Sequence, residues 1–337
     1  MGLPKTSQDV VMIKPITLLL LFCSFTVNAS ILVNGTFEAT KSCPAYLSKN
    51  RKSNPDNLMV EPNQKYQLKE INKTKPDWLR IQFADHQPNL RWVSVDCGVI
   101  EYTERPKASC DLSPGMADSY VLALSSQPGF CETYGYEIGK PECLKLTKTA
   151  YQANHLILHG LWPNQEACGH NYGYCGTSPR TNHCDYSPLD LSSDVAQNLK
   201  KLMPSYNYGS CLERHEWNKH GSCQDLSTDG YFSLAMRLTT EVNNTEFGQY
   251  LTAHRGDTVK LATLRELIER SFGENNTGKV TLSCKNGILV DIYVQLPALI
   301  PFKESLESLV DKASHSQHHD YCNNNVTISD FSNEKWL

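Results

Sequence analysis

The segments His155-Leu-Ile-Leu-His-Gly-Leu-Trp-Pro163 and Cys211-Leu-Glu-Arg-His-Glu-Trp-Asn-Lys-His-Gly-Ser-Cys223 carry the most reactive side chains of this 337-residue chain. The opening Cys-Leu-Glu-Arg of the second segment is compatible with a helix, in which each residue turns by about 100°. With His215 at 0°, Lys219 falls at about 40°, Glu216 at about 100° and His220 at about 140°. One side of one helix then carries two imidazoles, a carboxylate and an ammonium group, which suit acid–base chemistry on a phosphate. A merely solvated charged face seldom combines two histidines with a tryptophan and flanking cysteines.

His159-Gly-Leu-Trp-Pro163 and His215-Glu-Trp-Asn-Lys-His-Gly221 resemble the two active-site segments of the ribonuclease T₂ family, which consists of secreted acid endoribonucleases. The similarity runs from about Ser109 to the C-terminus. Within it, Leu124–Cys131 and Ser210–Arg214 are most similar to the bacterial periplasmic branch of the family. The chain departs from the family pattern at Ser126, where members of the family usually have Trp. That departure concerns base stacking or core packing at this position and leaves the chemistry untouched.

The resemblance implies five catalytic residues, His159, His215, Glu216, Lys219 and His220. In this assignment His220 is the general base and His159 is the general acid. His215 resembles the phosphate-binding imidazole, and Glu216 and Lys219 polarise and stabilise the transition state. RNA brings its own nucleophile, the 2′-hydroxyl beside the scissile phosphate, so the enzyme has only to move protons and stabilise charge.

The activity that the resemblance implies is endonucleolytic cleavage of single-stranded RNA with low base specificity. A 2′,3′-cyclic phosphate forms first and a 3′-phosphate follows, and no metal takes part in the chemistry. Trp162 is expected to bind substrate by lining the base pocket, and a core position in a strand-to-loop corner is the alternative. Trp217 is better explained as a core residue. His155 shares the strand face of His159 only if no β-bulge intervenes, and we interpret it as a structural histidine.

A zinc hydrolase is the competing class of enzyme, because His215-Glu216 resembles the start of a His-Glu-x-x-His motif. That motif needs its second histidine four residues on, whereas His220 is five residues on, about 140° around the helix, and position 219 is a lysine. Zinc held by closely spaced cysteines is excluded too, because no two cysteines form a Cys-x₂₋₄-Cys pair. A secreted binding protein with an inactive enzyme core is the third class, and the complete set of acid, base and phosphate residues argues against it.

A calcium site is suggested by Asp225-Leu-Ser-Thr-Asp229, which matches the first half of an EF-hand loop. Its ligands would be Asp225, Ser227 and Asp229, but position twelve is Met236 and no glutamate closes the loop. The alternative is that this stretch caps the helix that follows. No cofactor is required for the implied chemistry, so calcium would be structural only.

The first 29 residues are typical of a secretory signal peptide. A weakly basic start precedes the apolar run Ile16–Val27, which is too short to span a bilayer. Val27-Asn28-Ala29 supplies a small-residue cleavage site, and no later segment is apolar enough to cross a membrane. We therefore expect a secreted or periplasmic monomer without a membrane span.

Thirteen cysteines minus Cys23 of the leader leave twelve, an even number that indicates a disulfide framework in an exported chain. The family resemblance implies the bridges Cys131–Cys143, Cys184–Cys223 and Cys284–Cys322. Similarity to the bacterial branch adds Cys175–Cys211. The remaining cysteines would then pair as Cys43–Cys97 and Cys110–Cys168.

The formal charge of −4 becomes about −5 without the leader, which contains Lys5, Lys14 and Asp9. Since affinity for nucleic-acid backbones comes from Lys and Arg neutralising phosphates, this charge argues against a protein that coats DNA. Eleven histidines add positive charge in an acidic compartment, because their reference pKa is about 6.5. Composition therefore fits an acid-working enzyme that holds RNA locally better than a protein that coats DNA. DNA lacks the 2′-hydroxyl that the implied chemistry uses, so we do not expect it to be a substrate.

Residues 30–106 predict a small all-β domain. Turns rich in Asn, Pro, Asp and Lys separate short alternating apolar runs. These runs are Ile31–Val33, Leu58–Val60, Tyr66–Ile71, Trp78–Phe83 and Arg91–Val95. Their order resembles bacterial SH3-like barrels, which bind cell-wall or other surface ligands, and a merely covering domain is the alternative. Glu104–Ser109 is interpreted as the linker.

Residues 107–337 predict an α+β catalytic domain similar to the ribonuclease T₂ fold. Tyr120–Leu124 and His155–Leu158 are typical of central strands. Residues 194–203, 231–242 and 263–272 have helical apolar spacing, and 279–284 with 288–294 predict a hairpin around a Lys-Asn-Gly turn. Helices clustered between strands indicate an antiparallel central sheet with helices packed on it.

Overall fold

The computed structural model describes residues 30–50, 52–54, 56–83, 90–104, 110–169, 171–314 and 321–330. The predicted signal peptide, residues 1–29, and nearly all of the predicted linker lie outside the described residues. In the described part of the chain, no helix is long and apolar enough to cross a membrane.

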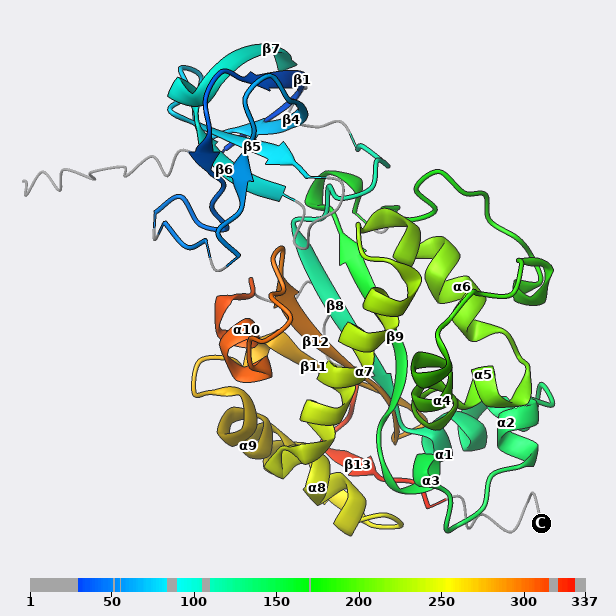
Figure 1. Cartoon of the computed structure of the whole chain (residues 1–337). Coiled ribbons are helices and arrows are strands. Elements are labelled where there is room, and N and C mark those ends of the chain that lie inside the picture. The colour runs from blue at the N-terminus through cyan, green and yellow to red at the C-terminus, as the bar shows by residue number, and fades with distance from the viewer. Residues whose placement is uncertain are drawn as a thin grey trace, which may run out of the picture.

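The first part of the chain forms a five-stranded antiparallel sheet, seen in blue and cyan in Figure 1, with the strand order β6-β5-β4-β1-β7. Its strands are β1 (Ile31–Ala39), β4 (Lys65–Ile71), β5 (Trp78–Gln82), β6 (Leu90–Ser94) and β7 (Gly98–Glu104), and β2 (Cys43–Pro44) pairs separately with β3 (Met59–Val60).

All five predicted apolar runs of this part fall on strands, and β7 was missed. The side chains of β7 are mostly exposed or half-buried, so it lacks the buried alternation that reveals a strand in a sequence. The strands enclose a core of their own around Phe37, Leu68 and Ile81. An SH3-like barrel stays a prediction.

The second part of the chain contains a six-stranded sheet with the order β10-β13-β12-β8-β9, and β11 pairs with β12. Its strands are β8 (Ser119–Ser125), β9 (Ile157–Asn164), β10 (Thr258–Lys260), β11 (Val280–Lys285), β12 (Ile288–Pro297) and β13 (Asn325–Thr327). Every pairing is antiparallel except the short contact between β12 and β13, so the predicted antiparallel sheet is confirmed for the central strands.

Helices pack on this sheet and complete the predicted α+β architecture (Figure 1). They are α1 (Gln127–Phe130), α2 (Pro141–Leu144), α3 (Tyr151–Asn154), α4 (Ser193–Leu202), α5 (Pro204–Tyr208), α6 (Leu212–Lys219), α7 (Thr228–Asn244), α8 (Glu246–Ala253), α9 (Leu261–Phe272) and α10 (Leu306–Lys312). The long helix α7 lies against β8 and β9, where Tyr231 and Phe232 are fully buried. The three predicted helices are confirmed as α4, α7 and α9.

Six disulfides are formed, and four of them confirm the predicted pairs: Cys43–Cys97, Cys110–Cys168, Cys131–Cys143 and Cys284–Cys322. The other two predictions, Cys184–Cys223 and Cys175–Cys211, are wrong. The bridges are instead Cys175–Cys223 and Cys184–Cys211, with Cα–Cα distances of 4.9 and 5.2 Å.

The geometry of α6 explains this exchange of partners. Cys211 immediately precedes α6 and Cys223 lies just after it, so an eight-residue helix of about 12 Å separates them. Each loop cysteine pairs with the helix end against which its loop packs. The backbone N–H of Cys175 points at Cys223 Sγ, 3.2 Å away, whereas the carbonyl of Cys184 accepts a hydrogen bond from Arg214 in the first turn of α6.

The first part of the chain contacts the second through polar and apolar side chains. Gln82 of β5 donates a hydrogen bond to Asp225 at 3.2 Å, and Leu32 of β1 packs against a small cluster that includes Met116 and Tyr172. The large core under the second sheet draws its buried members only from residues 122–328. Each sheet therefore has its own hydrophobic core.

A chain that begins at Cys110 should consequently still fold, because it keeps the whole large core and the Cys110–Cys168 bridge. We expect its thermal unfolding, followed by circular dichroism after oxidative refolding, to remain a single cooperative transition. A gradual transition, with the full-length chain unfolding cooperatively under the same conditions, would show that the large core depends on the first sheet.

Candidate active site

His159 stands at a β-bulge in β9. Ala123 of β8 pairs with Gly160, whereas the next residue of β8, Leu124, pairs with Leu158. His159 is therefore the extra residue of β9 at this point. A bulge turns the extra side chain away from the direction that strand alternation would give it.

Helix α6 carries three of the predicted catalytic residues, and the fourth follows directly. His215, Glu216 and Lys219 lie within α6, and His220 is its C-cap residue. The backbone N–H of His220 still donates to the carbonyl of Glu216 at 2.9 Å, so the helical path extends to this residue. The helical arrangement predicted from the spacing of these four residues is confirmed.

The carboxylate of Glu216 joins α6 to β9. Its Oε2 accepts a hydrogen bond from Nε1 of Trp162 at 2.8 Å, and its side chain is 1% exposed. The approach is this close because residue 160 is glycine: a Cβ there would lie 1.9 Å from Glu216 Oε2. Glu216 Oε1 lies 3.8 Å from Nε2 of His159, so the bulge and the helix bring these two side chains together.

Trp162 is the aromatic centre of the site. Its ring lies 5.3 Å from the rings of both His159 and His220, edge-on to the first and stacked on the second. The ring of Tyr293 lies 5.7 Å away on another side. Trp162 therefore holds the two histidines and Glu216 in place, and its predicted contact with a base stays a prediction.

The imidazole of His215 lies next to that of His220, with ring centroids 6.4 Å apart. His183, the first residue of a short 3₁₀ helix (His183–Asp185), stacks on His215 at 4.0 Å. Nδ1 atoms of His215 and His220 are buried and make no hydrogen bond within the described residues. These atoms are the polar groups that an incoming phosphate ester could engage.

Burial controls the protonation of three of these groups. It lowers the pKa of His215 to about 3, with the nearby charges of His183 and Lys219 acting in the same direction. It lowers the pKa of His220 well below 6.5, again with help from Lys219. It raises the pKa of Glu216 to about 7, although His159 and the Trp162 hydrogen bond oppose this shift.

His159 behaves differently from the other two histidines. Burial alone would lower its pKa, but the carboxylates of Asp291 and Glu216 outweigh burial and raise the pKa above 6.5. Asp291 lies on β12, and its Oδ1 is 3.8 Å from Nδ1 of His159. Neither Asp291 nor His183 was predicted. The signal of Asp291 was a lone charge in a mostly apolar strand, whereas no spacing or motif points to His183.

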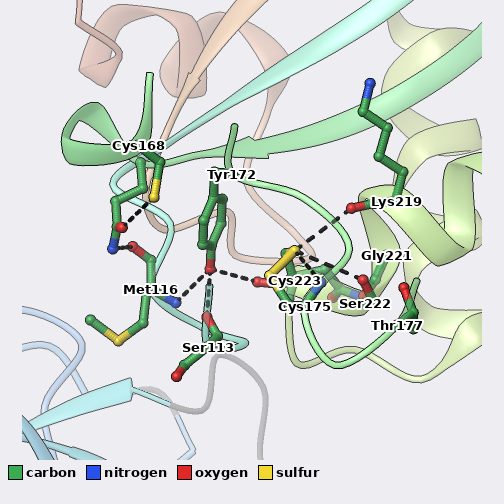
Figure 2. Close-up of a disulfide and its surroundings, with 12 residues drawn as sticks. Ser113, Met116, Cys168, Tyr172, Cys175, Thr177, Lys219, Gly221, Ser222 and Cys223 are labelled. Atoms are coloured by element: carbon green, nitrogen blue, oxygen red, sulfur yellow. Dashed lines mark hydrogen bonds between the residues drawn. A yellow bond between two sulfur atoms is a disulfide. The ribbon is translucent and has the colours of Figure 1, made fainter. Parts of the chain in front are cut away.

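Lys219 emerges from α6 next to the Cys175–Cys223 disulfide. Figure 2 shows its side chain extended away from the sulfur atoms. On the other side of the bridge, the hydroxyl of Tyr172 accepts a hydrogen bond from the backbone N–H of Met116 at 3.0 Å and lies 3.0 Å from the carbonyl of Cys223. This disulfide and its surroundings anchor the end of α6 from which Lys219 and His220 project.

Trp217 and His155 of the two segments are structural residues, as predicted. Trp217 packs edge-on against Tyr231 of the core, with ring centroids 5.8 Å apart. His155 stacks on Tyr151 at 4.0 Å, away from the site. Ser126, where the resemblance led us to expect a tryptophan, is the N-cap of α1 and accepts a hydrogen bond from the N–H of Gly129.

Protein contacts engage each of the three candidate calcium ligands. Ser227 is the N-cap of α7 and Asp229 accepts a hydrogen bond from the N–H of Ser192 at 3.0 Å, while Asp225 accepts one from Gln82. The helix-capping interpretation is therefore confirmed for Ser227. Among the residues that the structure describes, no group of three His, Cys, Asp or Glu side chains is placed to hold a metal ion. Structural calcium stays a prediction.

Comparison with known proteins identifies the family. The family model of the Ribonuclease T2 family matches residues 117–329. Ribonuclease I of Escherichia coli is 32% identical over 206 residues, which are 55% of this chain and 76% of that protein. Extracellular ribonuclease LE of Solanum lycopersicum is 30% identical over 166 residues, which are 46% of this chain and 65% of that protein. The solved SF11-RNase of Nicotiana alata, 19% identical, covers 63% of this chain with a TM-score of 0.44.

A sheet strand and a short helix that together present histidines, a carboxylate and a lysine define an acid–base enzyme. The chain belongs to the ribonuclease T2 family and is an endoribonuclease of that type.

The closeness of Glu216 to Gly160 can be tested with Gly160→Ala. The added methyl group must push Glu216 or β9 aside, because it would lie 1.9 Å from the carboxylate oxygen. Displacements of about 1 Å in a catalytic site cost about 10²-fold in rate, so kcat/KM on RNA should fall by about that factor. Gly230→Ala is the matched control, since the nearest atom to its Cβ is 3.3 Å away. Equal activity of the two variants would contradict the tight packing of α6 on β9.

Proposed function

We propose that this enzyme cleaves single-stranded RNA by transphosphorylation, with His220 as general base and His159 as general acid. The observation that carries the proposal is the opposite protonation bias of these two histidines around one tryptophan. Burial lowers the pKa of His220, so this ring is neutral and can accept a proton. The carboxylates beside His159 outweigh burial and raise its pKa, so this ring holds a proton that it can donate.

In the first step, His220 removes the proton of the 2′-hydroxyl, and the 2′-oxygen attacks the adjacent phosphorus. The bond from phosphorus to the 5′-oxygen breaks, and His159 protonates the departing oxygen. The products are a 2′,3′-cyclic phosphate and a free 5′-hydroxyl. In the second step water opens the cyclic phosphate to a 3′-phosphate, with the two histidines exchanging roles.

The other three residues act on the charge that develops at phosphorus. Lys219 supplies a positive charge, and the imidazole of His215 binds the phosphate. In the free enzyme His215 is neutral, because burial lowers its pKa to about 3, and a bound phosphate anion would favour its charged form. Glu216, with a pKa raised to about 7 by burial, lies beside the acid His159 and polarises the site.

We further propose that the mature enzyme is exported, as a secreted or periplasmic monomer that acts on RNA and not on DNA. Six disulfides support an oxidising compartment, since cytosolic thiols are kept reduced. The first sheet would be an accessory domain that contacts a cell-wall or other surface ligand or covers part of the enzyme. The chemistry needs no metal, and base specificity is low.

Replacing His159 or His220 with Phe should each lower kcat by about 10²–10⁴, the usual range for one acid–base partner. His215→Phe should act partly through phosphate binding and raise KM. His254→Phe is the control, because His254 stacks on Tyr250 outside the site. The decisive substrate is an RNA with one 2′-deoxy nucleotide on the 5′ side of the cut. Cleavage of that linkage at an undiminished rate would show that water is the nucleophile and would refute the proposal.

The pH profile of kcat/KM should be a broad bell that includes mildly acid pH. Activity requires neutral His220, so the rise comes at a pH well below 6.5, where this buried ring loses its proton. It also requires protonated His159, so the fall comes above 6.5, where that ring loses its proton. Initial rates on a dinucleotide at constant ionic strength measure both limbs. A profile that rises up to neutral pH would contradict the assignment of the base.

A further inference from the structure

The imidazole of His159 lies between two carboxylates that come from different elements. Its Nδ1 is 3.8 Å from Asp291 Oδ1 on β12, and its Nε2 is 3.8 Å from Glu216 Oε1 on α6. The side chain of His159 is 32% exposed, that of Asp291 is 18% exposed and that of Glu216 is 1% exposed. Each ring nitrogen of His159 thus has an acidic group beside it. Of these two acidic residues, only Glu216 belongs to the motif that indicates the family.

The carboxylate of Asp291 is held by the central sheet. Across the β8–β12 pair, Asp291 lies directly opposite Ser125, whose hydroxyl donates to Oδ1 at 2.5 Å. Tyr293, two residues along the same strand and so on the same face, donates its hydroxyl to Oδ2 at 3.4 Å. Two hydroxyl donors fix the position of this carboxylate relative to β9.

The two carboxylates differ in how deeply they are buried. Burial raises the pKa of Glu216 to about 7, so much of its charge is lost at mildly acid pH. Asp291 is more exposed than Glu216 and accepts hydrogen bonds from two hydroxyl groups, so its position beside Nδ1 of His159 is fixed by the sheet. The remaining charged neighbour, Lys219 of α6, acts in the opposite sense on the proton of His159.

We propose that Asp291 is a positioning residue for the general acid: it orients the His159 ring through Nδ1, leaves Nε2 to face the leaving oxygen, and keeps the ring protonated. The inference rests on the proposed role of His159 as the acid. Asp291 itself touches neither the phosphate nor the reacting atoms in this arrangement. It acts through the histidine, in the way that a carboxylate commonly fixes the orientation and the charge of an imidazole.

Asp291→Asn tests this role, because the amide keeps the size of the side chain and removes its charge. Without the carboxylate of Asp291, the effects of burial and Lys219 on His159 are opposed only by Glu216, so the pKa of His159 should fall. An opposite charge at 4–6 Å shifts a pKa by about 1–3 units. Because His159 is partly exposed, we expect the alkaline limb of the kcat/KM profile to move to lower pH by about one unit. The acid limb, set by His220, should stay in place.

The same shift should appear in the titration of the His159 Cε1–H signal, followed by NMR in the full-length oxidised protein and assigned with His159→Phe. This readout needs no substrate. Asp311→Asn, an exposed change of the same kind on α10, is the control for loss of one negative charge and should move neither the signal nor the limb. Asp291→Glu retains the charge, so the pKa of His159 in this variant should lie close to the wild-type value. A merely structural role of the aspartate would not explain that result.

An unchanged His159 titration in Asp291→Asn, in a variant that melts like the wild type, would overturn the inference. If the asparagine variant does not fold, Ser125→Ala replaces it: loss of this anchoring hydroxyl should lower the pKa of His159 by a smaller amount, and no change would likewise overturn the inference. A normal shift of the His159 signal with an unmoved alkaline limb would leave the Asp291–His159 coupling intact. That result would instead refute the proposed role of His159 as general acid.

Discussion

The contact between the Glu216 carboxylate and β9 is the constraint on which the site depends. It puts a side chain of α6 directly onto the backbone of β9, the edge strand beside β8, at a position where any residue larger than glycine would collide with it. The hydrogen bond from Trp162 fixes this approach, and the same tryptophan ring contacts both His159 and His220. Strand and helix thus form one unit, in which a shift of either element would move His159, His220 and Glu216 together.

Two disulfides fix the ends of α6 to neighbouring loops. Helix α6 is only eight residues long, too short to be stable alone, and most of its stability must come from its surroundings. Cys184–Cys211 ties its beginning to one loop and Cys175–Cys223 ties the turn after its end to another. Bridges of this kind typically contribute about 2–4 kcal/mol each, largely by restricting the unfolded chain. A helix that carries several groups of one site is thereby held without a large apolar face of its own.

Burial and nearby charges give the histidines of the site different pKa values. Burial alone disfavours the charged form of each histidine, and it depresses the pKa of His215 and His220. His159 escapes this effect because two carboxylates flank its ring. The placement of carboxylates, and not the choice of residue, therefore gives these histidines opposite pKa shifts. Burial of these polar groups lowers the stability of the fold. Apolar contacts in the two hydrophobic cores offset this loss.

The sequence by itself determined whatever depends on local periodicity. Spacing at about 100° per residue placed His215, Glu216, Lys219 and His220 on one side of a helix, and alternation or apolar runs located most strands of both sheets. The two motifs also sufficed to indicate the family. These features are encoded within segments of about ten residues, so neighbouring positions are enough to reveal them.

Tertiary structure alone decided which distant segments meet. The bulge that redirects His159 arises from pairing with β8, and Asp291 reaches that ring only because β12 lies on the other side of β8. His183 reaches the site from a short 3₁₀ helix that no periodicity predicts. The partners of Cys211 and Cys223, which flank α6, depend on which loop packs against which end of the helix. Contacts of this kind link residues separated by tens to more than a hundred positions. Their geometry depends on the packing of whole elements, which no local pattern of side chains specifies.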